Sequence, residues 1–166
     1  MFLNVILGIL IIVVIFLCYV VFKLVKQHTS FYNLIYSRTS GISVGEPIPF
    51  TDFLPSEPSG AQVLIFGKPT CSACRKLLMQ IQKEKLHQSI NISVLYQDSE
   101  SEQQEFSQQK HFSFPIKTIT KEQKSLFKIE VAPYTYVIDK QGIIRYKGVL
   151  SSREIVNAYK FVQATT

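Results

Sequence analysis

The segment VLIFGKPTCSACRKLL, residues 63–78, decides the fold of the chain. It belongs to an apolar stretch, 61–66, that is bounded by glycines and predicts a short strand buried on both faces. After the cysteines, leucine and isoleucine recur at helical spacing and predict a helix over 72–87. Cys71 and Cys74 therefore stand where a strand gives way to a helix.

This position has chemical consequences for the two cysteines. The N-terminus of a helix presents unpaired backbone N–H groups and the positive end of the helix dipole, which favour a thiolate over a thiol. Because the thiolate is the nucleophile in disulfide exchange, we expect Cys71 to be the attacking residue. Cys74 lies three positions further along the same helix, so we expect it to resolve the mixed disulfide by attacking the sulfur of Cys71.

Three other interpretations of the cysteine pair stay open: a structural disulfide, a zinc site and chance occurrence. A disulfide between such close neighbours closes a tiny loop and removes little entropy from the unfolded chain. A zinc site needs about four ligands, and the sequence has no second pair of cysteines. The histidines His28, His87 and His111 stand far apart. We expect neither a metal nor a cofactor, and we interpret Cys18 as an inert small hydrophobic residue.

The N-terminal segment is almost entirely apolar over residues 2–25 and reaches the roughly 20 residues that a membrane-crossing helix needs. It lacks the basic start and the small-residue cleavage site of a signal peptide, so we predict an uncleaved transmembrane helix. The expected organisation is an anchor over residues 1–26, a tether over 27–43 and one domain over 44–166.

The orientation of this anchor is predicted from two opposing arguments. Lys23 lies near the end of the apolar segment, and Lys26 and Arg38 follow it. The positive-inside rule taken alone would therefore place the domain in the cytoplasm. Long domains cross membranes largely regardless of flanking charge, however, and disulfide chemistry belongs to the oxidising side. We therefore expect a single-pass protein with an extracytoplasmic, periplasmic domain.

The charge pattern argues against nucleic acid as a partner. The formal net charge is +6, but the 18 basic residues are dispersed and form no Arg-rich stripe with interleaved aromatic residues. An anionic lipid surface or an acidic protein patch is a better match for this charge.

The rest of the domain predicts an α/β fold with a mixed central sheet covered by helices. A strand–helix–strand order implies a parallel pair with a right-handed crossover, and a later hairpin adds antiparallel strands. The further elements are a strand over 92–96, a helix from Ser99 towards Lys110, a short helix after Thr120 with Leu126, Phe127 and Ile129, a hairpin of 134–138 and 143–147, and a last helix capped by Ser151 with Ile155, Val156, Tyr159 and Val162 on one face.

Segments spread across the chain resemble one group of proteins. They are the anchor without basic residues ahead of it, Val44-Gly45-Glu46-Pro47, Pro69-Thr70-Cys71-Ser72-Ala73-Cys74 with Leu77-Leu78, Val131-Ala132-Pro133-Tyr134, and the stretch from Lys147 to Glu154. Together they resemble thioredoxin-fold proteins of the membrane-anchored TlpA/ResA kind, and most closely the MauD family of methylamine dehydrogenase accessory proteins. The cysteine pair and the downstream proline carry the likeness to the fold.

The resemblance implies a thioredoxin-like fold and a thiol-disulfide oxidoreductase whose redox pair is Cys71 and Cys74. It also implies a cis peptide bond before Pro133, packed against that pair, and a backbone at Ala132 that can pair with an extended substrate chain. An ordinary edge-strand proline is the other interpretation of Pro133.

In this family the implied role is maturation of a disulfide-rich subunit of a periplasmic enzyme. The implied partners are protein thiols or disulfides as substrates and a redox protein that resets the cysteine pair. A non-catalytic thioredoxin-like module that docks a partner, from a different functional class, stays open as the alternative.

Two departures from the family pattern bear on the chemistry. Relatives keep acidic residues at the positions of Ile65 and Leu77, and a tryptophan at the position of Thr70. Without those acids, the remaining stabilisers of a Cys71 thiolate are the helix N-terminus and nearby cations, of which Lys68 is the best placed.

Overall fold

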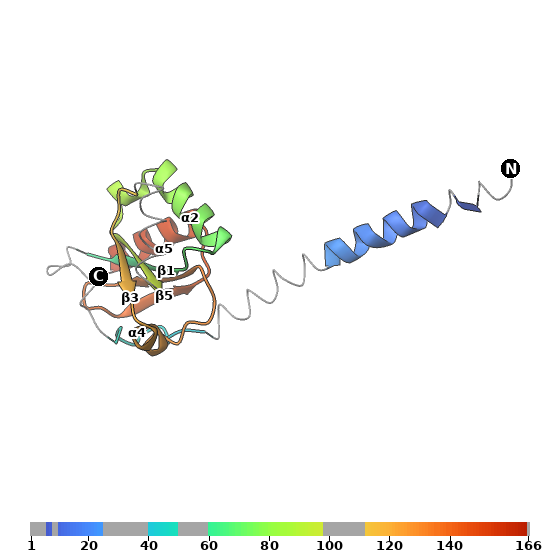
Figure 1. The fold of residues 1–166 in the computed structure, drawn as a ribbon. Helices are drawn as coiled ribbons and strands as arrows, with labels where there is room; N and C mark the ends of the chain where they lie inside the picture. The colour runs from blue at the N-terminus through green and yellow to red at the C-terminus, as the bar shows by residue number, and fades with distance from the viewer. Residues whose placement is uncertain (1–5, 8–9, 25–39, 50–59, 98–111, 166) are drawn as a thin grey trace. The chain divides into compact units, whose positions relative to one another are not determined.

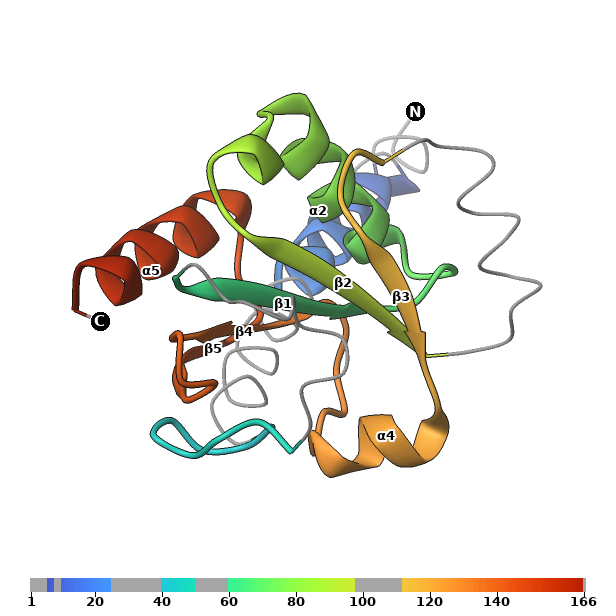
Figure 2. The same cartoon turned by 90° about the vertical axis from the view of Figure 1, so that its left-hand side faces the viewer.

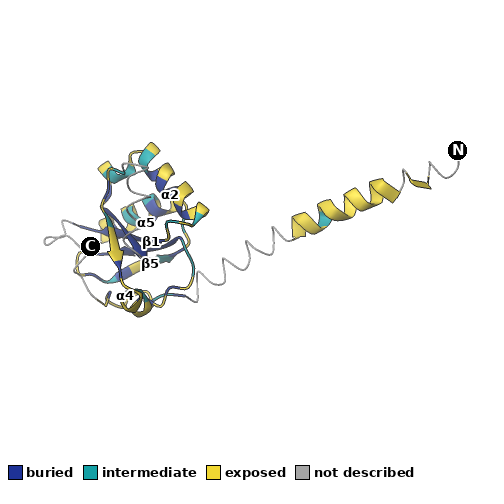
Figure 3. Cartoon of the chain, viewed as in Figure 1, coloured by how far each residue is buried: buried dark blue, intermediate teal, exposed yellow. Residues whose placement is uncertain are grey.

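The structure of the protein is a computed structural model that describes residues 6–7, 10–24, 40–49, 60–97 and 112–165. The chain falls into two compact units, Met1–Tyr36 and Ser37–Thr166. The first contains a helix over 10–24 whose apolar side chains are almost all exposed (Figure 3). Within the described ranges, no helix has both the length and the apolar character that a bilayer crossing requires.

The second unit is built on a five-stranded sheet in the order β3-β2-β1-β4-β5 (Figure 1). Strands β1, β2 and β3 are parallel, whereas β4 is antiparallel to β1 and β5 is antiparallel to β4, so the predicted mixed sheet is confirmed. The elements are β1 (Gln62–Gly67), α2 (Ser72–Lys83), the 3-10 helix η1 (Leu86–Gln88), β2 (Ile92–Gln97), β3 (Ile116–Ile119), α4 (Lys121–Leu126), β4 (Tyr134–Ile138), β5 (Ile144–Gly148) and α5 (Ser152–Thr165).

Helices cover the sheet on both faces, and each face carries its own hydrophobic core (Figure 2). Side chains alternate along a strand, so β1 sends Val63 and Ile65 towards α2 and α5, and Leu64 and Phe66 towards α4. Because β1 lies in the middle of the sheet, every one of its residues is buried, which explains the continuous apolar sequence there.

The segment 40–49 packs on the α4 face of the sheet, and we call it the leading segment (Figure 2). Two buried tyrosines hold it: the Tyr134 hydroxyl donates a 2.6 Å hydrogen bond to the Ser40 carbonyl, and the Tyr136 hydroxyl accepts one of 2.8 Å from the Ile42 amide. Gly41 lies between them with a positive φ of 80°, and a side chain there would collide with both hydroxyls.

The structure corrects the predicted element list in two places. No strand was expected at Ile116–Ile119, yet β3 forms there as an edge strand; two of its four residues, Lys117 and Thr118, are exposed, so it carries no buried-strand pattern. The helix predicted to reach residue 87 ends at Lys83, because Lys85 adopts a left-handed conformation with φ of 54°.

Other predicted elements are confirmed, although α4 ends at Leu126 and leaves Phe127 and Ile129, which its prediction included, outside the helix. The capping box at Thr120 and Gln123 opens α4, and Ser151 and Glu154 cap each other at the start of α5. The hairpin of β4 and β5 forms with an irregularity between Val137 and Ile138. The helix expected from 99 towards 110 lies outside the described residues.

Candidate active site

Cys71 is the residue that caps the N-terminus of α2. Its backbone is extended, with φ of −80° and ψ of 112°, and its sulfur accepts a 3.2 Å hydrogen bond from the backbone amide of Cys74. The sulfur thus satisfies one of the amides that a helix leaves unpaired at its start. Cys71 is half-buried and is a free thiol. A nucleophile in this position is both accessible and held at the positive end of the helix.

Cys74 differs sharply from Cys71 although it lies one turn away. It is buried, with 1% of its surface exposed, and is also a free thiol. Burial, followed by the hydrogen bond to the Cys71 side chain, raises the pKa of the Cys74 thiol to about 12. The pair therefore consists of one accessible sulfur and one buried sulfur that holds its proton.

The loop before β4 lies against the cysteine pair. The thiol of Cys71 donates to the carbonyl oxygen of Ala132 across 3.6 Å, and the peptide bond between Ala132 and Pro133 is cis, as the resemblance implies. Pro133 is buried and Ala132 is half-buried. Antiparallel pairing of β1 with β4, in which Phe66 faces Tyr134, positions this loop at the end of β1 where the cysteines follow.

Besides the Cys71 side chain and the backbone of Lys68, apolar side chains and one phenol lie in the core around Cys74. Ile65 and Leu77, which the family resemblance places where an acid would stand, are both buried. The residue that sequence reasoning missed is Tyr96, which is 1% exposed and pairs with Gly67 in the parallel register of β1 and β2. In the sequence, Tyr96 is marked only by its position at the end of an apolar strand. Its proximity to the cysteines follows from the register of β1 with β2.

The cations near the pair lie on its solvent side. Lys68, Arg75 and Lys76 are all exposed. The carbonyl of Lys68 accepts a 3.1 Å hydrogen bond from the Cys71 amide, which ties the loop between β1 and α2. Nothing tests the stabilising role of the Lys68 side chain, which stays a prediction.

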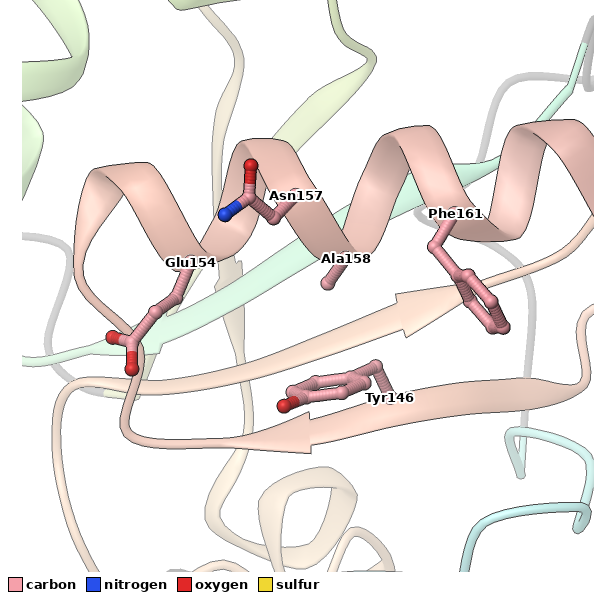
Figure 4. Close-up of a pocket in the computed structure, with 5 residues that line it drawn as sticks. All are labelled: Tyr146, Glu154, Asn157, Ala158 and Phe161. Carbon is pink, nitrogen blue, oxygen red and sulfur yellow. The ribbon is translucent and has the colours of Figure 1, made fainter.

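A separate pocket of about 360 Å³ lies between β5 and α5, lined by Tyr146, Glu154, Asn157, Ala158 and Phe161 (Figure 4). None of these residues belongs to the Cys71 segment or to the loop before β4, so this pocket is not part of the candidate site. In the part of the chain that the structure describes, no group of three His, Cys, Asp or Glu side chains is arranged to hold a metal ion.

The fold and the site together define a class of protein. A mixed sheet of this order, with a Cys-x-x-Cys pair capping the helix after β1 and a cis-proline against it, is the arrangement of the thioredoxin fold. The chain belongs to the family of thioredoxin-like domains, which matches residues 56–163.

Among curated proteins, the chain is similar to methylamine utilization protein MauD from several bacteria. It is 24% identical to the protein of Methylobacillus flagellatus over 111 residues, covering 67% of this chain and 54% of the relative. With the protein of Paracoccus denitrificans the identity is 29% over 100 residues, covering 60% and 50%. The chain thus spans about half the length of the curated relatives it matches.

Solved structures show the same fold. The thioredoxin domain of a thiol-disulfide oxidoreductase from Bacteroides vulgatus superposes with a TM-score of 0.58 at 17% identity, covering 73% of this chain and 99% of that one. A thiol:disulfide interchange protein DsbE from Chlorobium tepidum gives a TM-score of 0.58 at 15% identity, covering 71% and 99%.

Proposed function

We propose that this protein is a thiol-disulfide oxidoreductase that exchanges disulfides with the cysteines of other proteins. The observation that carries the proposal is the asymmetry of the pair: Cys71 is half-buried at a helix N-terminus, whereas Cys74 is buried with its pKa raised to about 12. An exposed nucleophile next to a sheltered second thiol is suited to a two-step exchange.

In the first step, the Cys71 thiolate attacks one sulfur of a substrate disulfide. A bond forms between Cys71 Sγ and that sulfur, and the other substrate sulfur leaves as a thiolate and takes up a proton. In the second step, Cys74 loses its proton and attacks Cys71 Sγ, which closes the Cys71–Cys74 disulfide and releases the second substrate sulfur as a thiolate. Two electrons pass from the cysteine pair to the substrate, and the reverse sequence oxidises a substrate dithiol.

The loop before β4 is suited to hold the substrate. The Ala132 carbonyl lies 3.6 Å from Cys71 Sγ, so the backbone at this position borders the reacting sulfur. An extended substrate segment that adds main-chain hydrogen bonds at Ala132, with buried Pro133 behind it, would place its own cysteine against Cys71.

The N-terminal sequence and the relatives support a proposal for location and substrate. We infer that residues 1–26 anchor the protein in a membrane and that the domain works outside the cytoplasm, where protein disulfides persist. The similarity to methylamine utilization proteins supports maturation of a disulfide-rich enzyme subunit as the task. A separate redox protein then resets the cysteine pair after each exchange.

Reduction of insulin by dithiothreitol, catalysed by the full-length chain in detergent, tests this proposal. We expect catalysed precipitation of insulin with the wild-type chain and with Cys18→Ala, and none above background with Cys71→Ser. Equal rates for wild type and Cys71→Ser would instead favour a non-catalytic module that only docks a partner.

A further inference from the structure

Tyr96 lies at the carboxyl end of β2, on the sheet face that α2 covers. It belongs to the same buried core as Ile65, Leu77 and Leu78, and 1% of its surface is exposed. The parallel register places it beside Gly67, the last residue of β1 before the loop that leads to the cysteines. A large phenol is therefore buried at the same end of the sheet as the redox pair.

Gly67 brings the phenol next to the resolving thiol. A Cβ atom at this glycine would lie 2.6 Å from Cε1 of Tyr96 and 3.6 Å from Cβ of Cys74, so both side chains border the space that glycine leaves open. Cε1 adjoins the carbon that carries the hydroxyl, and it is nearer than Cδ1 at 3.3 Å. The ring edge formed by Cε1 and Cδ1 therefore lies over Gly67, where the side chain of Cys74 also packs.

The two groups also interact through their charges. Burial is the first cause that raises the pKa of Tyr96, and negative charge on Cys74, then on Cys71, adds to it. A phenol that keeps its proton can stabilise a thiolate near it through its O–H dipole, and such an interaction is strong where water is excluded.

Few other groups can stabilise a thiolate at Cys74. Among the described residues, negative charge on Cys71 raises the pKa of Tyr96, and the charge of Arg75, which is exposed, lowers it. Tyr96 pairs with Gly67 of β1 and Thr118 of β3, and it shares a core with Ile65 and Leu77. None of these residues ionises. The buried acid among the described residues, Asp139, is bound to Arg145 at the β4–β5 turn.

Building on the proposed function, we infer that Tyr96 is a positioning residue for Cys74: its ring fixes the buried thiol over Gly67, and its hydroxyl stabilises the thiolate that resolves the mixed disulfide. In this step Cys74 Sγ bonds to Cys71 Sγ, and the bond from Cys71 Sγ to the substrate sulfur breaks. The leaving substrate thiolate takes up a proton in place of the one that Cys74 gives up. Tyr96 keeps its own proton throughout.

Stopped-flow reaction with Ellman's reagent separates the two steps, because attack by Cys71 releases the first thionitrobenzoate and resolution by Cys74 releases the second. The reduced full-length chain in detergent is used in a Cys18→Ala background, over a range of pH. We expect Tyr96→Phe to leave the first phase within about twofold, to slow the second about tenfold at neutral pH, and to move the pH midpoint of the second phase upward.

Tyr136→Phe is the matched control, since Tyr136 is an equally buried tyrosine on the opposite face of the sheet. We expect it to change neither phase beyond twofold. Should Tyr96→Phe unfold, Gly67→Ala provides the same test, because its methyl group must displace the phenol ring and is expected to slow the second phase alone.

The inference is overturned by a second phase that Tyr96→Phe or Gly67→Ala leaves unchanged in the folded protein, or by an equal slowing in Tyr136→Phe. Failure of the proposed function would look different: the wild-type chain would not turn over protein disulfides such as insulin, whatever the two phases with the small reagent show.

Discussion

The two ends of strand β4 bury polar groups in opposite ways. After its last residue, the carboxylate of Asp139 accepts hydrogen bonds from the amides of Gln141 and Ile143, each 2.9 Å, and from Arg145 Nε at 2.7 Å. Before its first residue, the loop at Ala132 faces a cysteine pair in an apolar setting, where the buried thiol of Cys74 has a raised pKa.

This difference separates stability from reactivity within one strand. At the Asp139 end, burial alone would raise the carboxyl pKa, but hydrogen bonds from Ile143, Arg145 and Gln141 outweigh it and hold the pKa below its ordinary value. At the cysteine end, burial disfavours the thiolate of Cys74 relative to its thiol. The thiolate is needed only when Cys74 attacks the mixed disulfide. A buried ionisable group that is fully hydrogen-bonded fixes the fold, and one that is not remains available for chemistry.

The largest effect is expected from replacing a cysteine at the reactive end of β4. Cys71→Ser should lower the rate of disulfide exchange at least about 100-fold, because a hydroxyl does not replace a thiolate as nucleophile. Cys74→Ser should keep the nucleophile and accumulate mixed disulfides with substrate proteins, visible as adducts on non-reducing gels. Faster alkylation of Cys74 than of Cys71 in the reduced wild-type chain would reverse the two roles.

The next largest effect is expected on the free energy of unfolding, from changes at the Asp139 end of β4. Asp139→Ala should lower the free energy of unfolding by about 3 kcal/mol, because it leaves two amides and a guanidinium without their acceptor. Arg145→Ala should cost only about 1 kcal/mol, since the Arg145 side chain is 46% exposed. Urea unfolding measures both. If Asp139→Ala slowed disulfide exchange more than twofold in the folded protein, the two ends would not be separable.

The pH dependence of stability should divide between the two ends. A lowered carboxyl pKa means that Asp139 adds stability above its unfolded pKa of about 3.9, and that this is lost as pH falls through the folded pKa. A raised thiol pKa means that Cys74 adds stability below 9.0, which is lost as pH rises towards about 12.

Unfolding of the reduced chain at a series of pH values checks this division. Asp139→Asn should flatten only the loss of stability at acid pH. Cys74→Ala should flatten the loss of stability between pH 9.0 and 10.0, the ordinary pKa of tyrosine, above which Tyr96, Tyr134 and Tyr136 also contribute. If Cys74→Ala left the loss of stability at alkaline pH unchanged, the buried thiol would not be its cause.

The smallest effect concerns Thr135, which pairs with Ile65 across β1 and β4. Its hydroxyl is buried and has no hydrogen-bond partner within the described part of the chain. Thr135→Val should therefore raise the free energy of unfolding by about 1 kcal/mol, whereas Tyr136→Phe, which removes a bonded hydroxyl, should lower it by about as much. Destabilisation by Thr135→Val in urea unfolding would show that the hydroxyl has a partner.

Local sequence patterns predicted the part of the site that one segment contains. Cys71 and Cys74 sit between a buried apolar strand and an amphipathic helix, and each of these signals is complete within residues 61–83. The cis bond before Pro133 came instead from family resemblance, because nothing local distinguishes it from an ordinary edge-strand proline.

What the sequence did not reveal depends on contacts between distant segments. Tyr96 comes to the cysteines only through the register of β1 with β2, and periodicity describes it merely as another core residue. Strand β3 was missed because an edge strand with half its residues exposed has no apolar pattern to detect. The early end of α2 arises at Lys85, where no glycine marks a left-handed residue.

The fastening of the leading segment has a mechanical consequence. Tyr134, Tyr136 and Lys147 bind the chain at Ser40, Gly41 and Ile42 from strands β4 and β5, on the sheet face away from α2. Tension on the chain ahead of Ser40 would therefore be carried by the sheet and not by the helix that bears the cysteines.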